Sequence, residues 1–276
     1  MTTRRGSWQL PISEGELSSL TREMEQAHRE TLPAMRAGAV DLAEEIRTKQ
    51  QQQRGGEARD AGRRRFLLGA GGAGVALVLA ACSSNKTSSS GSPSPGTSLM
   101  AASPSGSGLY TGDLQIVALS TALENQAVVA YKAALDAATA GKLGTVPPAV
   151  ANFITTAMAQ HADHAKAWNA VLTGAGKPAI TDVPLSNQAQ TLQALGAATD
   201  VPTVARLALS LEDQAAQTYL FATFSITNPA GIATAATIAP VEAMHAAILN
   251  YVLGQYPVPD DFLPTDAAAS TSLLTV

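Results

Sequence analysis

Two stretches of the sequence carry the same chemistry-bearing residues in the same order, an acid followed by a histidine. Glu124 lies in Leu-Glu-Asn-Gln-Ala, which is echoed by Leu-Glu-Asp-Gln-Ala around Glu212. Further along, His164 and His245 each open the pattern His-Ala-x-x-x-Asn-x-Val-Leu. Such a repeat indicates a duplicated structural unit. Carboxylates and imidazoles bind transition metals, so the repeat predicts a metal site shared by both copies, or the remnant of one.

Three glutamates fall on helix faces that are otherwise apolar. At helical spacings, Glu212 and Glu242 are surrounded by alanine and larger apolar residues, while Glu124 also has Ser120 and Thr121 nearby. Burying an ionised carboxylate costs on the order of several kcal/mol unless a partner compensates it. No lysine or arginine occurs at a spacing that would supply that partner from the same helix. A divalent cation would satisfy all three acids at once.

The histidines complete the candidate set. Glu242-x-x-His245 places an acid and an imidazole one turn apart on one helix face, where both can reach a single ion. The corresponding place in the first copy holds His161-x-x-His164. The predicted metal ligands are Glu124, His161, His164, Glu212, Glu242 and His245. Tyr131, Tyr219 and Gln160 are predicted to contact and support these ligands. The alternative for the two tyrosines is that they are ordinary core aromatics.

Four long helices must position these residues. Proline, aspartate or asparagine marks where these helices begin, and glycine marks where they end. The expected helices are 116–140, 148–173, 200–226 and 229–254. Short connections make each pair antiparallel, and the link 174–199, with a short helix predicted near 187–195, can set the third helix parallel to the second. Pro240 either kinks the fourth helix or starts a separate one. The fold class is all-α, a four-helix bundle of two hairpins joined by a long crossover.

Residues 110–255 resemble the ferritin-like superfamily. The resemblance rests on the four-helix layout and on Glu124, His164, Glu212, Glu242 and His245 at the family's ligand positions. It implies a di-iron or di-manganese centre. The family carries a second Glu-x-x-His where this chain has His161-x-x-His164, so an imidazole replaces one bridging carboxylate. That departure leaves open whether one ion binds or two, and which metal is preferred.

A second resemblance concerns residues 63–82. Arg63-Arg64-x-Phe66-Leu67 resembles the twin-arginine export motif. The apolar stretch that follows is too short to span a bilayer comfortably and is typical of a signal peptide. It ends at Leu-Ala-Ala-Cys82, which resembles a bacterial lipobox. The resemblance implies the twin-arginine machinery and the membrane as partners, lipidation at Cys82, and a location on the outer face of the cytoplasmic membrane. The alternative for Cys82 is a buried free thiol.

Composition and sequence character divide the chain. The net charge of −4 gives no basic face for nucleic acid. A single cysteine excludes an internal disulfide. The polar N-terminal part carries a weak amphipathic pattern that includes Met24 and His28, and Lys49–Gly56 is expected to be loose. The long stretch before Arg63 is either an extended signal region or precedes a true start at a later methionine, such as Met24 or Met35. The predicted parts are a polar extension (1–62), the signal segment and lipobox (63–82), a Ser/Gly/Pro linker (83–108), the bundle (109–255) and a tail (256–276).

Three functions are compatible with this sequence. If two irons bind with an open coordination position, the resemblance implies a di-iron oxidase or ferroxidase that oxidises Fe(II) with O₂ or peroxide. The second function is metal binding at the cell envelope without turnover. The third is a metal-free bundle with a structural or partner-binding role. A membrane tether on every subunit disfavours a closed storage shell, and the sequence leaves the oligomeric state open.

Overall fold

The computed structural model describes residues 8–69, 108–258 and 264–276, with the side chains of 56–69 excepted. It is all-helical over these residues and contains no strand. The chain divides into two compact units, residues 1–47 with 104–276 and residues 48–103, and the description below concerns the first. The elements are α1 (Glu14–Gly69), α2 (Asp113–Thr139), α3 (Pro148–Gly174), α4 (Gln188–Ala197), α5 (Val201–Ser225), α6 (Pro229–Val252) and the 3₁₀ helix η1 (Thr271–Leu273).

Local sequence signals set the bounds of the bundle helices. α3 begins with Pro148 at its first turn, and the Asp200 side chain caps α5 by accepting from the Thr203 N–H. Asn228 caps α6 in the same way. These residues satisfy the backbone N–H groups that a helix start leaves unpaired. The long helices predicted from the sequence are therefore confirmed, and α6 runs unbroken through Pro240 as one helix.

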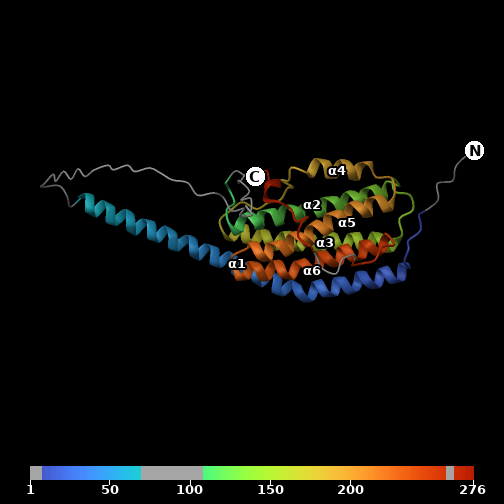
Figure 1. Cartoon of the computed structure of the whole chain (residues 1–276), viewed down its shortest axis with the longest axis horizontal. Helices are drawn as coiled ribbons and strands as arrows, with labels where there is room; N and C mark the ends of the chain where they lie inside the picture. The colour runs from blue at the N-terminus through green and yellow to red at the C-terminus, as the bar shows by residue number, and fades with distance from the viewer. Residues whose placement is uncertain (1–7, 70–107, 259–263) are drawn as a thin grey trace, which may run out of the picture. The chain divides into compact units, whose positions relative to one another are not determined.

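The bundle consists of two hairpins, α2 with α3 and α5 with α6, joined through α2 and α5 (Figure 1). Tyr131 of α2 bonds Glu212 of α5, and Tyr219 of α5 bonds Glu124 of α2. Since the later residue of each helix meets the earlier residue of the other, α2 and α5 are antiparallel. α5 is then parallel to α3, as the long crossover predicts.

The crossover and the tail are fixed to the bundle by polar contacts. Asn125 and Asn169 side chains donate to the Ile180 carbonyl in the crossover, and α4 packs on α2. In the tail, the Ala269 N–H donates to Thr218 Oγ1, and Leu274 pairs with Leu185 as an isolated antiparallel bridge. The described part of the tail is thus draped over the bundle.

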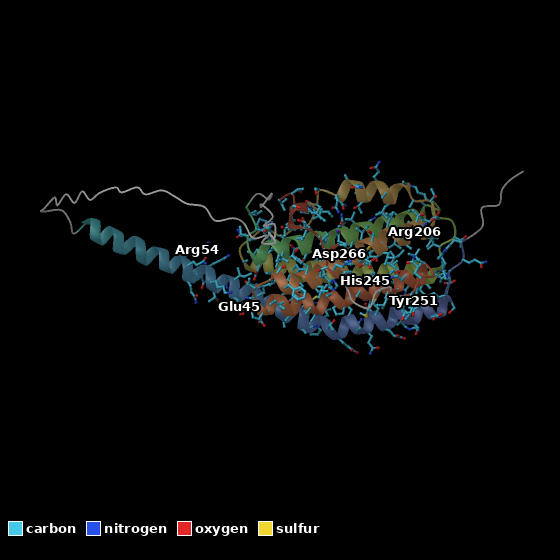
Figure 2. All side chains as sticks on the ribbon, in the orientation of Figure 1. Glu45, Arg54, Arg206, His245, Tyr251 and Asp266 are labelled. Atoms are coloured by element: carbon cyan, nitrogen blue, oxygen red, sulfur yellow. The ribbon has the colours of Figure 1, made fainter. Side chains whose placement is uncertain are left out.

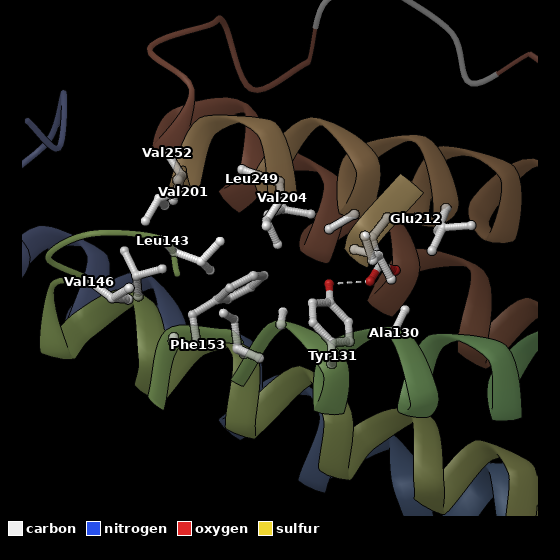
Figure 3. A pocket seen from close by; sticks show the side chains of 18 of the residues that line it. Ala130, Tyr131, Leu143, Val146, Phe153, Val201, Val204, Glu212, Leu249 and Val252 are labelled. Carbon is white, nitrogen blue, oxygen red and sulfur yellow. Dashed lines mark hydrogen bonds between the residues drawn. The ribbon is translucent and has the colours of Figure 1, made fainter. Parts of the chain in front are cut away.

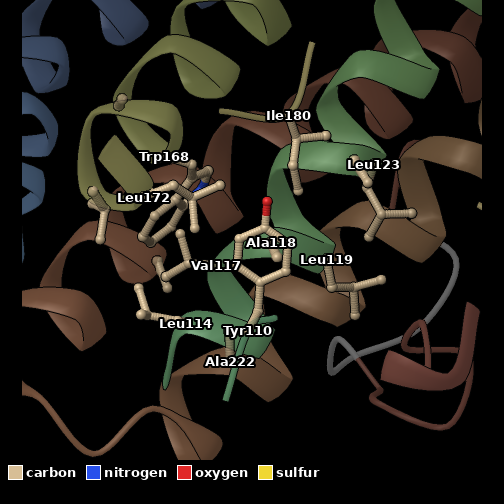
Figure 4. Packing of buried hydrophobic residues seen from close by; sticks show 14 of the residues in the cluster. Tyr110, Leu114, Val117, Ala118, Leu119, Leu123, Trp168, Leu172, Ile180 and Ala222 are labelled. Carbon is tan, nitrogen blue, oxygen red and sulfur yellow. The ribbon is translucent and has the colours of Figure 1, made fainter. Parts of the chain in front are cut away.

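Two apolar clusters fill the core, one toward each end of the bundle. The first surrounds the fully buried Trp168 and Leu172 of α3 and includes Val117 of α2 (Figure 4). The second surrounds Phe153, farther toward the N-terminal end of α3. On each of the four bundle helices, the candidate ligands fall between the residues of one cluster and those of the other. The polar site is therefore enclosed by apolar packing at both ends.

α1 is the largest addition to the sequence-based picture. Its residues up to Arg47 belong to the same compact unit as the bundle. Leu17 and Met24 join one apolar cluster, and Met35 and Leu42 join the other. Where the sequence predicts a loose run at Lys49–Gly56, the structure continues α1 instead. Glutamine and arginine are good helix formers, so this run needs no apolar face to extend an existing helix.

The export motif and the lipobox fall on residues whose side chains the structure does not describe. Arg63, Arg64, Phe66 and Leu67 lie on the last turns of α1, where side chains are not described. Cys82 and all but the last residue of the 83–108 linker lie outside the described residues. Among the described helices, α6 alone has the length and hydropathy of a membrane span, and half of that stretch is buried in the protein, as in a core helix.

Close approach between α1 and α6 requires a glycine. A Cβ on Gly38 would collide with the Thr234 hydroxyl and lie 3.1 Å from the Ala230 carbonyl oxygen. We therefore expect Gly38→Ala to lower the free energy of unfolding by about 1–3 kcal/mol, the usual cost of overpacking. Gly55→Ala is the matched control, because nothing lies within 4 Å of its Cβ position. In urea denaturation the control should be neutral or slightly stabilising, and equal behaviour of the two variants would contradict the observed packing.

Candidate metal centre

The candidate ligands come from all four bundle helices and meet in the interior. Glu124 projects from α2, His161 and His164 from α3, Glu212 from α5, and Glu242 and His245 from α6; all six side chains are at most 2% exposed. Figure 2 labels His245 among the side chains of the bundle. The six residues form two overlapping groups of four, in each of which one ligand atom per residue lies within 4.8 Å of the others.

The first group contains Glu124, His161, His164 and Glu242. His164 Nδ1 lies 2.9 Å from Glu242 Oε1 and 3.4 Å from Glu124 Oε1. His161 Nδ1 lies 2.7 Å from Glu124 Oε2. Two carboxylates and two imidazoles thus converge on one point, which is a donor set suited to a divalent transition metal.

The second group contains His161, Glu212, Glu242 and His245. His245 Nδ1 lies 3.2 Å from both Glu212 Oε2 and Glu242 Oε2. His161 Nε2 lies 3.1 Å from Glu212 Oε1. His161 and Glu242 belong to both groups. The arrangement therefore offers two overlapping sets of residues, each of which could hold an ion.

Glu124 and Glu212 each belong to only one of the two ligand groups, and each accepts a hydrogen bond from a tyrosine of the other hairpin. Tyr131 donates to Glu212 Oε1 (Figure 3), and Tyr219 donates to Glu124 Oε1. Trp168 Nε1 in turn donates to the Tyr219 hydroxyl at 2.9 Å. These bonds fix the orientation of the carboxylates that would bind the metal, the role that groups behind metal ligands generally play. The Trp168 bond makes the Glu124 side the more extensively supported of the two.

α1 supports the opposite side of the site. His245 Nε2 donates to Gln160 Oε1 at 2.8 Å, which leaves Nδ1 to face the carboxylates. Gln160 Nε2 then donates to Glu25 Oε2 of α1 at 2.7 Å. The buried ring of His28, also on α1, lies 5.3 Å from the ring of His164. A helix outside the four-helix bundle therefore orients one candidate ligand and covers another.

The carboxylates of Glu124 and Glu212 are held in their charged form. Burial alone would raise the pKa of Glu124, but His164 and His161 outweigh burial and hold that pKa at about 2. Burial likewise opposes ionisation of Glu212, and His161 and His245 nevertheless hold its pKa well below the usual range. Buried carboxylates stay ionised only when such partners are present.

The imidazoles show the converse effect. Burial lowers the pKa of His164, but Glu124 and Glu242 more than compensate and raise it to about 9. Burial also opposes the charged form of His161, whose pKa is nonetheless raised well above its ordinary value by Glu242 and Glu212. His28, facing His164, differs: burial and His164 lower its pKa to about 4. In the metal-free site, protonated imidazoles thus occupy the role that metal ions would take over.

Several buried polar atoms in the site have no hydrogen-bond partner. They are both ring nitrogens of His164, Glu242 Oε1 and His28 Nε2. His164 Nδ1 and Glu242 Oε1 are close together, but their geometry makes no hydrogen bond. Buried polar atoms are almost always paired, and unpaired ones beside such a donor set fit a bound ion. The donor set and these unpaired atoms together fit a metal centre.

Two cavities reach the site. An apolar cavity of about 40 Å³ extends from Val201 and Phe153 to Tyr131 and Glu212 (Figure 3). A smaller one of about 10 Å³ lies between α2 and α5 and is bordered by Glu124, His161 and two glutamines. The smaller cavity is near the minimum size for one water molecule. The first offers room to an apolar small molecule, and the second is polar at its border.

All six residues that the sequence predicts as metal ligands lie close together in the structure. The sequence did not indicate the supporting roles of Glu25 and Trp168. The spacing of Met24 and His28 on one helix face was the available signal for α1. Nothing in the sequence indicated which bundle helix this face would contact, since that depends on the three-dimensional packing.

The tyrosine bonds give a graded prediction. Tyr131→Phe removes a hydrogen bond to a buried charged group and should cost about 1.5–3 kcal/mol. Tyr219→Phe should cost roughly 1–3 kcal/mol more, because it also leaves Trp168 Nε1 unpaired. Tyr110→Phe is the control, since its hydroxyl only donates to the Pro178 carbonyl. Urea denaturation of the metal-free variants measures all three, and a Tyr219→Phe effect no larger than the Tyr110→Phe effect would contradict the network.

A family model described as a ferritin-like domain matches residues 112–255. This range contains all four bundle helices and all six candidate ligands. Comparison with curated proteins gave no significant match, and comparison with solved structures gave none.

Proposed function

The chain belongs to the ferritin-like domain family, and on that premise we propose that it binds two divalent iron or manganese ions and oxidises Fe(II) with O₂ or peroxide. The observation that carries the proposal is the pair of overlapping ligand groups, buried between two apolar clusters. Glu124 and His164 would hold one ion, and Glu212 and His245 the other. His161 and Glu242 would contribute to both.

The ligand chemistry supports binding of the metal. Iron accepts mixed carboxylate and imidazole donors, and carboxylates also suit manganese. Tyr131, Tyr219 and Gln160 hold three of the ligands in fixed orientations. Pre-orientation of this kind typically accounts for tenfold to hundredfold in metal affinity.

The cavity supports oxidation rather than storage or structural binding alone. Bound iron would supply the one-electron redox chemistry that O₂ or peroxide needs. The chain supplies an apolar cavity of about 40 Å³ that ends at Glu212 and Tyr131. An apolar cavity of that kind admits an uncharged molecule such as O₂ more readily than an ion. The same packing keeps bulk water from the ligands.

Export and anchoring form a second part of the proposal. The motif at Arg63, Arg64, Phe66 and Leu67 and the lipobox at Cys82 support passage through the twin-arginine machinery and anchoring on the outer face of the cytoplasmic membrane. Expressed in a bacterium, the chain should then fractionate with membranes. Cys82→Ser should release it or leave the precursor uncleaved, and replacement of Arg63 and Arg64 by lysine should keep it in the cytoplasm.

An anaerobic titration of the full chain with Fe(II), followed by elemental analysis and exposure to O₂, tests the metal function. We expect two ions per chain and Fe(II) oxidation faster than in buffer, with both lost in Glu212→Ala. Two bound ions without accelerated oxidation would leave a metal-binding protein without turnover. No bound metal would overturn the proposal and leave a structural or partner-binding bundle.

A further inference from the structure

We infer that His161 bridges the two ions through both of its ring nitrogens, so that the centre is an imidazole-bridged pair of divalent ions. The inference rests on the proposed function for the presence of two ions, and it concerns how they are joined. Common two-metal sites hold their ions about 3.5–4 Å apart, and the family pattern has a carboxylate at this position. With metal–nitrogen bonds of about 2.0–2.1 Å on either side of the ring, an imidazole bridge holds them roughly 6 Å apart.

The orientation of the ring carries the inference. His161 Nδ1 lies 2.7 Å from Glu124 Oε2, and Nε2 lies 3.1 Å from Glu212 Oε1. Those two glutamates belong to different ligand groups. Turning the ring over would present carbon atoms to both carboxylates, so the two contacts fix one orientation. The Tyr131 ring stacks against the imidazole at a centroid distance of 5.7 Å and limits its movement further.

Glu242 is placed to span the same pair. Its Oε1 lies 2.9 Å from His164 Nδ1, in the first group, and its Oε2 lies 3.2 Å from His245 Nδ1, in the second. Each ion would then have one glutamate and one histidine of its own. His161 and Glu242 would be shared between the ions. The first ion would be held by Glu124 and His164, and the second by Glu212 and His245.

The charges of such a centre balance. A protonated imidazole carries a proton on each ring nitrogen, so a bridging His161 must release both protons to bulk water and then carries one negative charge. With Glu124, Glu212 and Glu242, the bridge brings the ligand charge to −4, which equals the charge of two divalent ions. A centre buried in apolar surroundings strongly favours such neutrality. His161 thus replaces both the geometry and the charge of a missing carboxylate.

The bridge also predicts a change in metal preference. Imidazole suits zinc, copper, iron and nickel, whereas carboxylates suit manganese. His161→Glu would restore the four-carboxylate set. We therefore expect this variant to gain Mn(II) affinity relative to Zn(II) by about tenfold or more, by analogy with the size of effects on metal ligands. Competition titrations of the two metals on the wild-type chain and the variant measure the shift.

The distance between the ions tests the bridge directly. The full chain loaded with Zn(II) is crystallised, and anomalous diffraction locates the ions; X-ray absorption measures the same distance in solution. The expected separation is roughly 6 Å in the wild type and about 3.5–4 Å in His161→Glu. His161→Gln should bind at most one ion, because an amide cannot join the two positions.

The outcomes separate this inference from the proposed function. Two Zn(II) ions 3.5–4 Å apart in the wild-type chain would overturn the bridge and leave the proposed function standing. A single bound ion would overturn the bridge and the two-ion form of the proposed function together. The absence of any bound ion would overturn the proposed function itself. The wild-type measurement needs no variant, so the test stands even if a substitution prevents folding.

Discussion

Replacing Glu242 by glutamine is expected to lower metal affinity by more than about 100-fold, because this residue belongs to both ligand groups. Residues that merely support metal ligands account for up to about 100-fold, so loss of a shared ligand should exceed that. Glutamine keeps the size of the side chain but removes its charge. Isothermal titration with Zn(II) and elemental analysis after dialysis measure the effect.

The same substitution should destabilise the protein without any metal present. Glu242 lies within 3.6 Å of a ring nitrogen of each of the histidines 161, 164 and 245. Removing one partner from a buried ionic network typically costs about 3–5 kcal/mol, because the remaining charges are left without compensation.

Asp136→Asn is the control for that stability measurement. Asp136 pairs with Lys132 at the surface, and such a pair contributes less than about 1 kcal/mol. Both variants lose one carboxylate charge, so a difference between them reports the buried site. Equal unfolding midpoints in urea would show that Glu242 does not serve the network.

The stability of the metal-free protein is expected to be highest near pH 6.5 and to fall on both sides, because the pKa of His28 is lowered from 6.5 to about 4 and its contribution is lost as the pH falls through 4. The pKa of His164 is raised from 6.5 to about 9 in the folded protein, so its stabilisation is complete below 6.5 and is lost as the pH rises through 9. The pKa of Glu124 is lowered from 4.5 to about 2, so its stabilisation is complete above 4.5 and is lost as the pH falls through 2. His161 and Glu212 shift in the same respective directions.

The metal-loaded protein should show the opposite slope on the alkaline side. Each bound ion displaces protons from the imidazoles, so metal affinity rises with pH. The metal-free form should lose roughly 1 kcal/mol per pH unit for each imidazole that titrates. Thermal unfolding from pH 6.5 to 9, with and without Zn(II), measures both slopes. His164→Gln should flatten the metal-free slope, and a metal-free protein whose stability rises over this interval would refute the assignment of these groups.

The sequence was sufficient for the bundle and for the clustering of the candidate ligands, because both follow local rules. Helix starts at Pro148, Asp200 and Asn228 are set by the residues themselves. An acid such as Glu212 on an apolar face can be compensated only by something that the same helix does not provide. The duplicated pattern then placed the ligands in matching registers, and convergence followed from the antiparallel hairpins.

The contribution of α1 could not be obtained in this way. Its contact with the bundle depends on small residues, with Gly38 against Thr234 and Ala43 against Gly174. Glycine and alanine are only weakly hydrophobic, so a helix face formed by them gives little periodicity in a polar sequence. The bond from Glu25 to Gln160 likewise depends on how two distant helices are offset, which no local pattern encodes. Similarly, the hydrogen bonds from Tyr131 to Glu212 and from Tyr219 to Glu124 depend on the antiparallel packing of α2 against α5, which the sequence alone does not show.

The docked helix α1 has a topological consequence for a chain exported as proposed. Glu25 and the bundle touch, so both must share one aqueous compartment. Cleavage before Cys82, as proposed, would separate α1 from the exported bundle, and the contact would be lost. Gln160 would then lose its acceptor on α1, and the rings of His164 and His245 would become freer to turn. The precursor and the exported bundle would therefore hold metal with different strengths.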